Sequence, residues 1–169
     1  YGSGIDGAVI MGTGMQSKIQ LAAARALAGI QILFCGPKHV SKLIDKLAFG
    51  MFNKRIEAPK TPSDWLCSNE ESVKRYRQDP MCNFTFTANG FQTLMKLIWN
   101  LHDVEKLKKM PRQLPVFFVA GEEDPVGDYG RAVKQVYESF LQLGMERVQM
   151  KLYPGDRHER LHEPDRAEV

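Results

Sequence analysis

Two short, nearly continuous apolar runs, each closed by glycine, constrain the fold of this chain more than any other feature. The first is residues 5–14 (IDGAVIMGTG) and the second is residues 115–121 (PVFFVAG). A strand that is apolar on both sides is buried on both faces, which is typical of parallel sheets. Residues 148–153 (VQMKLY) alternate in part and predict a third strand nearer the sheet edge. We therefore predict an α/β fold with about three parallel strands.

Helical patterns occupy the intervals between these strands. Four segments before the second strand have the apolar spacing or the start signals of helices: residues 17–27, stopped by the Gly-Pro at 36–37; residues 40–50; a short helix from residue 69; and residues 91–109. Residues 131–144 form an amphipathic pattern closed by glycine, and the charged tail from residue 159 predicts the start of another helix. Strand, helical block, strand, helix and strand is an α/β order. Three strands make a thin sheet with few flanking helices, so we expect the chain to be part of a larger fold.

Composition excludes several classes of protein and of partner. With 169 residues, of which 25% are charged, the chain has the size and make-up of one globular domain. Its net charge of +3 comes without a dense basic run, so a nucleic-acid partner has little support. The apolar segments 21–30 and 30–35 are too short or too mixed for a membrane span of about 20 residues. Tyr1 opens into a glycine-rich turn, which predicts no signal peptide.

The cysteines indicate the redox compartment. Cys35, Cys67 and Cys82 are an odd number at unrelated spacings, and they match neither a disulfide framework nor the paired spacing of a zinc site. We expect three ordinary thiols, each of them a small buried or half-buried side chain. This usage predicts a reducing, cytoplasmic compartment.

Ionisable side chains follow two of the predicted strands. Asp124 lies in the sequence GEEDPVG after the second strand, and His158 lies in GDRHE after the third. Because the carboxyl ends of parallel strands meet at one edge of a sheet, we expect the two side chains to be neighbours. A carboxylate beside an imidazole fixes the tautomer of the ring and stabilises its charged form. The pair is therefore the candidate acid and base of a catalytic site.

Nearby residues offer alternatives for both roles. Glu123 is one residue from the candidate acid, and His162 is four residues beyond the candidate base. His162 lies on the charged tail and is expected to be exposed. His102 shares a helix face with apolar residues, so we expect it to be packed, and His39 precedes a helix and is expected at the surface.

Two regions of the chain together resemble a known family. Residues 115–127 and residues 152–159 closely resemble the C-terminal end of α/β-hydrolases of the lysophospholipase or monoacylglycerol-lipase-like group, also called the serine aminopeptidase S33 group. This resemblance implies that Asp124 and His158 are members of a Ser-His-Asp triad. Residues 61–66 and 76–80 look like the helical cap of that family.

The resemblance covers nearly the whole chain and implies its division into three parts. Residues 1–14 are a core strand, residues 15–110 are a helical cap and return helix, and residues 111–169 are the C-terminal core strands and helix that carry the acid and histidine turns.

The nucleophile of that family has no counterpart among the serines of this chain. The family carries it in a G-x-S-x-G turn after a strand. None of the seven serines has glycine at both second positions: Ser3, Ser17, Ser41, Ser63, Ser68, Ser72 and Ser139. We therefore expect this chain to be the C-terminal portion of an α/β-hydrolase, with the nucleophile and oxyanion-hole amides outside it. Alone, it should be inactive.

For the intact protein, the resemblance implies hydrolysis of a carboxylic ester, such as a lysophospholipid or a monoacylglycerol, with no metal or organic cofactor. The Met and aromatic side chains of residues 49–86 either form an acyl-binding wall or are the interior of the cap. The alternative function is a non-catalytic, hydrolase-like module for binding or assembly. An unpaired sheet edge would favour a homo-oligomer or pairing with the missing N-terminal part.

Overall fold

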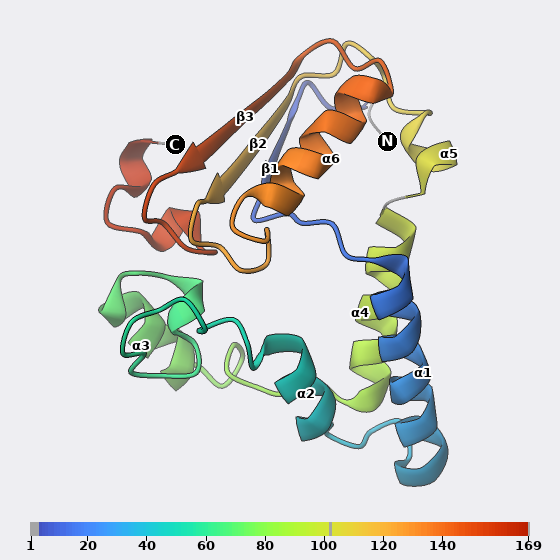
Figure 1. Cartoon of the computed structure of the whole chain (residues 1–169), viewed down its shortest axis with the longest axis vertical. Helices are drawn as coiled ribbons and strands as arrows, with labels where there is room; N and C mark the ends of the chain where they lie inside the picture. The colour runs from blue at the N-terminus through green and yellow to red at the C-terminus, as the bar shows by residue number, and fades with distance from the viewer. Residues whose placement is uncertain (1–3, 102, 169) are drawn as a thin grey trace.

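The computed structural model describes residues 4–101 and 103–168 and contains one parallel sheet of three strands (Figure 1). Its strands are β1 (Ala8–Met11), β2 (Val116–Gly121) and β3 (Val148–Tyr153), in the spatial order β1-β2-β3. Val116 lies opposite Ala8 on one side and opposite Val148 on the other. The predicted α/β class and the three parallel strands are confirmed. The prediction that the first strand is buried on both faces is wrong, because β1 lies at the edge of the sheet and Val9 on it is exposed.

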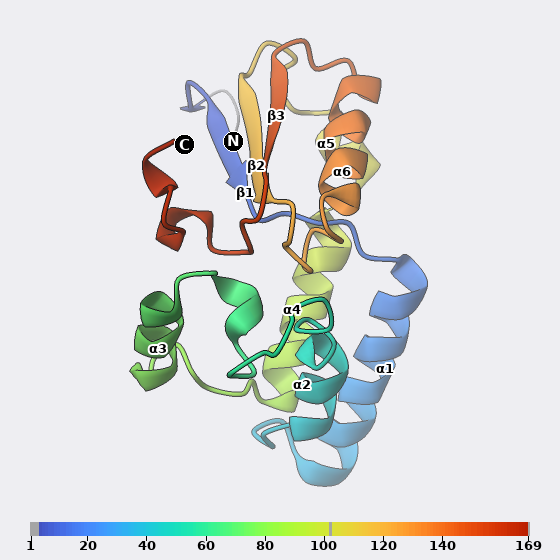
Figure 2. The ribbon, with the colours of Figure 1, turned by 60° about the vertical axis from the view of Figure 1, so that its left-hand side comes forward.

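The core of the sheet forms around β2 because its side chains are apolar on both faces. Phe118 and Val119 point to opposite faces and both are fully buried. Helix α6 (Arg131–Gln142) covers one face, and the ring of Phe140 packs edge-on against Phe118 at 5.1 Å between centroids. The C-terminal turns lie on the other side of the sheet (Figure 2).

The helical region lies below the sheet in the view of Figure 1. It comprises α1 (Lys18–Cys35), α2 (Lys42–Phe49), the 3₁₀ turn η2 (Asp64–Leu66), α3 (Glu70–Gln78) and α4 (Ala88–Leu101), whereas the short helix α5 (Val104–Leu107) lies beside α6 at the level of the sheet. Helices α1 and α4 run side by side, and Ala28, Ile44 and Phe91 form a small core among α1, α2 and α4. A second small core, of Leu66, Cys67 and Val73, lies beneath α3.

Three helix boundaries differ from those predicted. Helix α1 continues to Cys35 because Leu27 is followed by further helix-compatible residues and the chain leaves the helix only at Gly36, at φ +86°. The single helix expected over 91–109 is two, since the side chain of Asp103 accepts a hydrogen bond from the backbone of Glu105 and starts α5. The charged tail forms two 3₁₀ turns, η3 (Arg160–His162) and η4 (Arg166–Glu168), instead of an α-helix.

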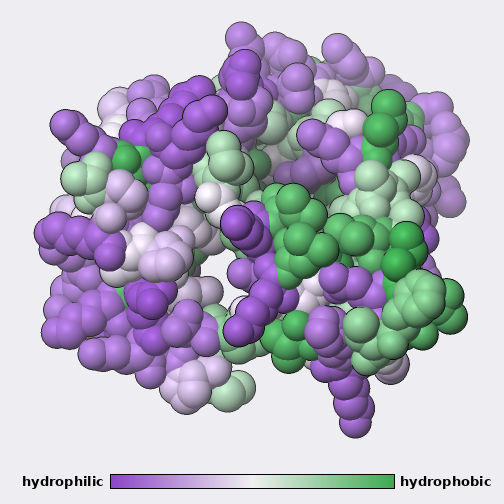
Figure 3. All heavy atoms as spheres, turned by 60° about the horizontal axis from the view of Figure 1, so that its bottom comes forward, coloured by the Kyte–Doolittle hydropathy of each residue, from purple (hydrophilic) through white to green (hydrophobic). Residues whose placement is uncertain are grey.

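Helix α1 joins the two apolar segments that the sequence suggested were separate. By length and composition alone, its 18 residues are enough to cross a membrane, although helices of soluble proteins meet the same criterion. Much of its apolar surface is uncovered here. Figure 3 shows apolar side chains gathered on the face that carries the helical region, and the exposed ones include Leu33, Phe34, Leu43 and Leu47.

Candidate active site

The carboxyl ends of β2 and β3 bring Asp124 and His158 together. β2 ends at Gly121 and β3 ends at Tyr153, and these two residues are paired across the sheet. Oδ2 of Asp124 lies 3.0 Å from Nδ1 of His158. The backbone passes very close here, because a Cβ on Gly121 would lie 2.0 Å from the carbonyl oxygen of Asp156. Glycine at the end of β2 therefore allows the two turns to meet.

The carboxylate of Asp124 is fixed on both oxygens. The residue is fully buried, and Oδ1 accepts a hydrogen bond from the backbone N–H of Val126 at 2.8 Å. Oδ2 is left to face the imidazole. Glu123, the alternative acid, is exposed and makes no contact with His158 in the described part of the chain. The structure therefore brings the histidine to Asp124 and not to its neighbour.

The imidazole of His158 lies between a glycine and an indole. A Cβ on Gly12, at the end of β1, would come within 2.9 Å of Cε1 of the ring, and Gly12 has φ +60°. The ring of Trp65 packs against the imidazole at 5.3 Å between centroids. The His158 side chain is 27% exposed, and its only polar contact among residues 4–101 and 103–168 is Asp124. Since a carboxylate can only accept, Nδ1 carries the proton and Nε2 keeps a free lone pair.

The other histidines do not join this pair. Nδ1 of His162 lies 3.0 Å from a carboxylate oxygen of Glu159, but His162 is exposed on η3. His39 is exposed before α2, as predicted. His102, expected to be packed, falls outside the described residues.

No serine of the described part of the chain contacts His158. Five of the hydroxyls have other partners: Ser41 accepts from the backbone of Ile44, Ser63 from Arg77 and Ser72 from Arg75, while Ser68 donates to Glu163 and Ser139 to the carbonyl of Val136. Ser17 lies at the N-terminus of α1, and its side chain does not cap the helix. Ser3 falls outside the described residues. Among the residues that the structure describes, the pair of Asp124 and His158 therefore has no serine hydroxyl beside it.

An aromatic cavity of about 540 Å³ adjoins this pair. It is lined by Phe49, Trp65, Tyr76, Phe84 and Phe86, among others. Trp65 connects the two places, because its ring lines the cavity and also packs on His158. Met51 and Met81, which the sequence grouped with these aromatic residues, are exposed instead.

In the described ranges, no three His, Cys, Asp or Glu side chains gather as metal ligands. The three cysteines are unpaired, as predicted; Cys67 is buried and Cys82 half-buried. Cys35, expected to be buried or half-buried, is exposed, because it is the last residue of α1 and its side chain is not covered by α4.

Sequence patterns did not identify three neighbours of the site. Gly12 looked like an ordinary turn residue, Trp65 looked like one more cap aromatic, and Glu163 carried no signal. Gly12 and Trp65 reach the site only through contacts between segments far apart in the chain, and Glu163 bonds both to the nearby Arg157 and to the distant Ser68. Glycine at the end of a predicted strand was the one local hint, because such positions often allow a side chain to approach the backbone.

Comparisons with known proteins point to one family. The model of the family described as serine aminopeptidase, S33, matches residues 1–165. Among solved structures, a thermostable carboxyl esterase from Bacillus coagulans is similar, with a TM-score of 0.82 and 29% identity over 99% of this chain and 54% of that one. A protein described as a lipase in its open form has a TM-score of 0.77 and 27% identity, over 97% and 53% of the two chains.

A monoacylglycerol lipase from Paleococcus ferrophilus has a TM-score of 0.57 and 16% identity over 97% of this chain and 55% of that one, and this likeness concerns the fold alone. No curated protein matches the chain by sequence. The chain spans about half the length of these solved structures.

Proposed function

The chain belongs to the serine aminopeptidase S33 family of α/β-hydrolases, and we propose that the intact protein hydrolyses carboxylic esters with Asp124 as the acid and His158 as the base of its triad. The observation that carries this proposal is the 3.0 Å contact between Oδ2 of Asp124 and Nδ1 of His158 at the carboxyl ends of two parallel strands. The nucleophile would be a serine in the part of the protein that this chain does not include.

The geometry of the pair suits general base and then general acid catalysis. Nε2 of His158 would take the proton from the serine hydroxyl as its oxygen attacks the acyl carbon. The buried carboxylate of Asp124 would stabilise the imidazolium that results, and Nε2 would return the proton to the leaving alcohol. Water would then attack the acyl-enzyme by the same route, releasing the carboxylic acid and the serine.

We place the acyl part of the substrate in the aromatic cavity. Its lining combines five aromatic rings with polar and charged side chains such as those of Asp45 and Arg77, and Trp65 brings it next to His158. A pocket lined by aromatic side chains with a few polar groups at one end is the usual form of a site for an apolar ligand. Two similar solved structures are described as a carboxyl esterase and a lipase. A lysophospholipid or a monoacylglycerol is the substrate that we propose, and the three unpaired thiols support a reducing, cytoplasmic location.

The test replaces one histidine and uses a second as its control. In the full-length protein, His158→Ala should lower ester turnover by about 10³-fold or more, with an unchanged melting temperature. His162→Ala removes a histidine that is also paired with a carboxylate and lies four residues away, and it should keep normal turnover.

A serine-directed fluorophosphonate probe completes the test. It should label the full-length protein and leave residues 1–169 alone unlabelled. Normal turnover in His158→Ala would remove this residue from the mechanism. A full-length protein that neither reacts with the probe nor hydrolyses acyl esters would favour a non-catalytic binding or assembly module.

A further inference from the structure

A fully buried carboxylate joins the turn that carries His158 to a segment of the helical region. The carboxylate of Glu163 accepts hydrogen bonds from the backbone N–H of Ser68 at 3.0 Å, from the Ser68 hydroxyl, and from the backbone N–H of Arg157 at 2.8 Å. An ionised carboxylate has acceptors only, on two oxygens, so one side chain can satisfy all three donors. Hydrogen bonds to a charged acceptor are about twice as strong as neutral ones.

The residues on both sides of His158 are bonded to that same segment, residues 64–68. The backbone N–H of Glu159 donates to the carbonyl oxygen of Leu66 at 2.7 Å. The guanidinium of Arg157 donates to two carbonyl oxygens of the 64–68 segment, at 2.7 and 3.0 Å. His158 is therefore fixed through its two neighbours in sequence, in addition to its own contact with the acid.

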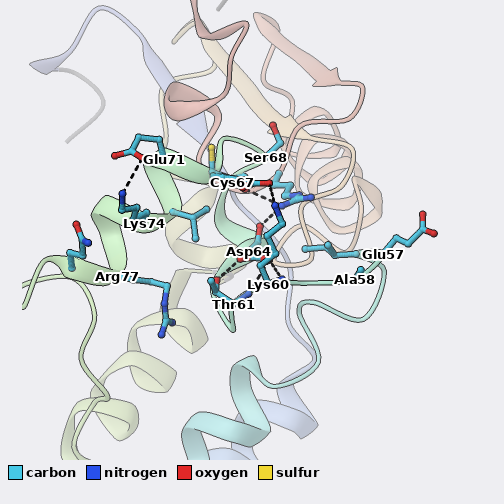
Figure 4. A pocket seen from close by; sticks show the side chains of 15 residues that line it. Glu57, Ala58, Lys60, Thr61, Asp64, Cys67, Ser68, Glu71, Lys74 and Arg77 are labelled. Carbon is cyan, nitrogen blue, oxygen red and sulfur yellow. Dashed lines mark hydrogen bonds and ion pairs between the residues drawn. The ribbon is translucent and has the colours of Figure 1, made fainter.

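The 64–68 segment is itself held in place. The carboxylate of Asp64 accepts hydrogen bonds from the backbone N–H groups of Lys60 and Thr61, at 2.6 and 3.1 Å (Figure 4). Burial alone would raise the pKa of Asp64, but a hydrogen bond from the Thr61 hydroxyl, the two backbone hydrogen bonds and the charge of Arg157 lower it below its ordinary value. The same segment carries Trp65, the residue that packs on the imidazole.

From these contacts we propose that Glu163 is a positioning residue for the reaction. Its carboxylate holds the 157–163 turn against the 64–68 segment through its hydrogen bonds with Arg157 and Ser68, which we call the clamp. The clamp positions the imidazole of His158 against Asp124 and Trp65. The clamp also joins the catalytic histidine to the wall of the aromatic cavity, since Trp65 belongs to both. The inference rests on the proposed function, because it assigns a role only if His158 is the base.

The first test is Glu163→Gln in the full-length protein. Glutamine has the same shape, but it has one acceptor oxygen and its NH₂ group would face backbone N–H donors. We expect kcat for ester hydrolysis to fall on the order of 100-fold, with little change in KM, because a small misplacement of a catalytic group has an effect of this size. The rate of fluorophosphonate labelling should fall by the same factor, since it reports how well His158 activates the nucleophile.

Two further variants examine the clamp without changing Glu163. Ser68→Ala removes one of the three hydrogen bonds and should lower kcat less than Glu163→Gln does. The double variant Ser68→Ala with Glu163→Gln should be no slower than Glu163→Gln alone, because both changes break the same clamp.

Arg157→Met keeps the carboxylate and removes the two hydrogen bonds to the 64–68 segment, so it should also lower kcat with little change in KM. It serves as the decisive variant if Glu163→Gln fails to fold.

The control separates positioning from stability. Val136→Ala creates a cavity in the core under α6, away from the 157–163 turn, and should lower the melting temperature without lowering kcat below that temperature. If Glu163→Gln, or Arg157→Met in its place, behaves like Val136→Ala, the clamp is structural only and the inference is overturned. Single effects that multiply in the double variant would also overturn it. Normal turnover in His158→Ala would instead refute the proposed function.

Discussion

The position of His158 depends on Gly12, a residue that has no functional group. A methyl group at Gly12 would lie 2.9 Å from Cε1 of the imidazole, closer than carbon atoms pack, and φ is +60°. Gly12→Ala should therefore displace the ring and lower kcat/KM on the order of 100-fold. The measurement is steady-state ester hydrolysis by the full-length protein beside its thermal melt.

Gly36→Ala is the matched control for that variant. Gly36 has φ +86°, also in the left-handed region, but a Cβ there would meet nothing within 4 Å. It carries the same kind of backbone strain without the contact, so it should lower stability and leave kcat/KM unchanged. Equal losses of activity in the two variants would show that strain, and not contact with His158, is responsible.

The three thiols should differ in reactivity. Burial raises the pKa of Cys67 to about 12, so almost no thiolate forms at neutral pH, whereas Cys35 is exposed at the end of α1. Under native conditions an alkylating reagent should modify Cys35 in minutes and leave Cys67 unmodified until the protein is denatured. Mass spectrometry of digested samples would measure this, and rapid native modification of Cys67 would contradict the packing described here.

Individual site residues could be predicted from the sequence where the order of strands and turns was enough to determine their positions. The strand ends placed Asp124 and His158 at one edge of the sheet, and the structure brings them together. Glu163 could not be found in the same way, because its partner Ser68 is 95 residues earlier in the chain. A buried glutamate in a charged tail has the same local pattern as an exposed one.

Among the elements, strands were easier to predict than helix ends. β2 has apolar side chains on both faces, and a short continuous apolar run of this kind is typical of a strand buried in a parallel sheet. Helix ends depend on capping hydrogen bonds, and a single side chain, such as that of Asp103 at the start of α5, can determine where a helix begins. The tail forms 3₁₀ turns because the buried side chain of Arg160 makes ion pairs with Asp156 before it and Asp165 after it. The composition of the tail did not predict these contacts.

The turn that follows β3 should make stability depend on pH between about 4 and 7. Burial raises the pKa of Asp156 to about 6 from an ordinary 3.8; the 2.7 Å ion pair with Arg160 opposes this, and the nearby Asp165 and Glu163 add to it. As pH rises through this range, the unfolded chain loses the Asp156 proton first, so the folded state loses stability, by up to about 3 kcal/mol. About one pH unit above the folded pKa, near pH 7, this loss is complete, and it is constant beyond.

Asp156→Asn removes the titrating group and provides the comparison. The difference in unfolding free energy between the natural protein and this variant, from urea denaturation, should change between about pH 4 and 7 and stay level above that range. A difference that stays level over this range would mean that the pKa of Asp156 is not raised in the folded protein.

On the scale of the whole molecule, the described chain is a thin sheet beside a helical region that is only partly covered. The predicted order of elements already indicated a thin sheet with few flanking helices, and the chain spans about half the length of the similar solved structures. The relative placement of the helices and the sheet depends on long-range contacts such as those of Arg157 with the 64–68 segment. Those contacts have no local signature, which is why the cavity beside His158 could be suspected but not located.

The edge of the sheet leads to a last prediction, for residues 1–169 studied alone. In the part of the chain that the structure describes, β1 pairs with β2 only, and Val9 on it is 61% exposed. An apolar edge strand with free backbone groups is a template for pairing with another chain. We expect sedimentation velocity to show self-association that increases with concentration.

Val9→Lys should shift the population towards monomer, because a lysine on an edge strand opposes pairing, whereas Leu141→Lys on the exposed side of α6 should not. Equal effects of the two lysines, or a monomer at every concentration, would show that the β1 edge does not drive association.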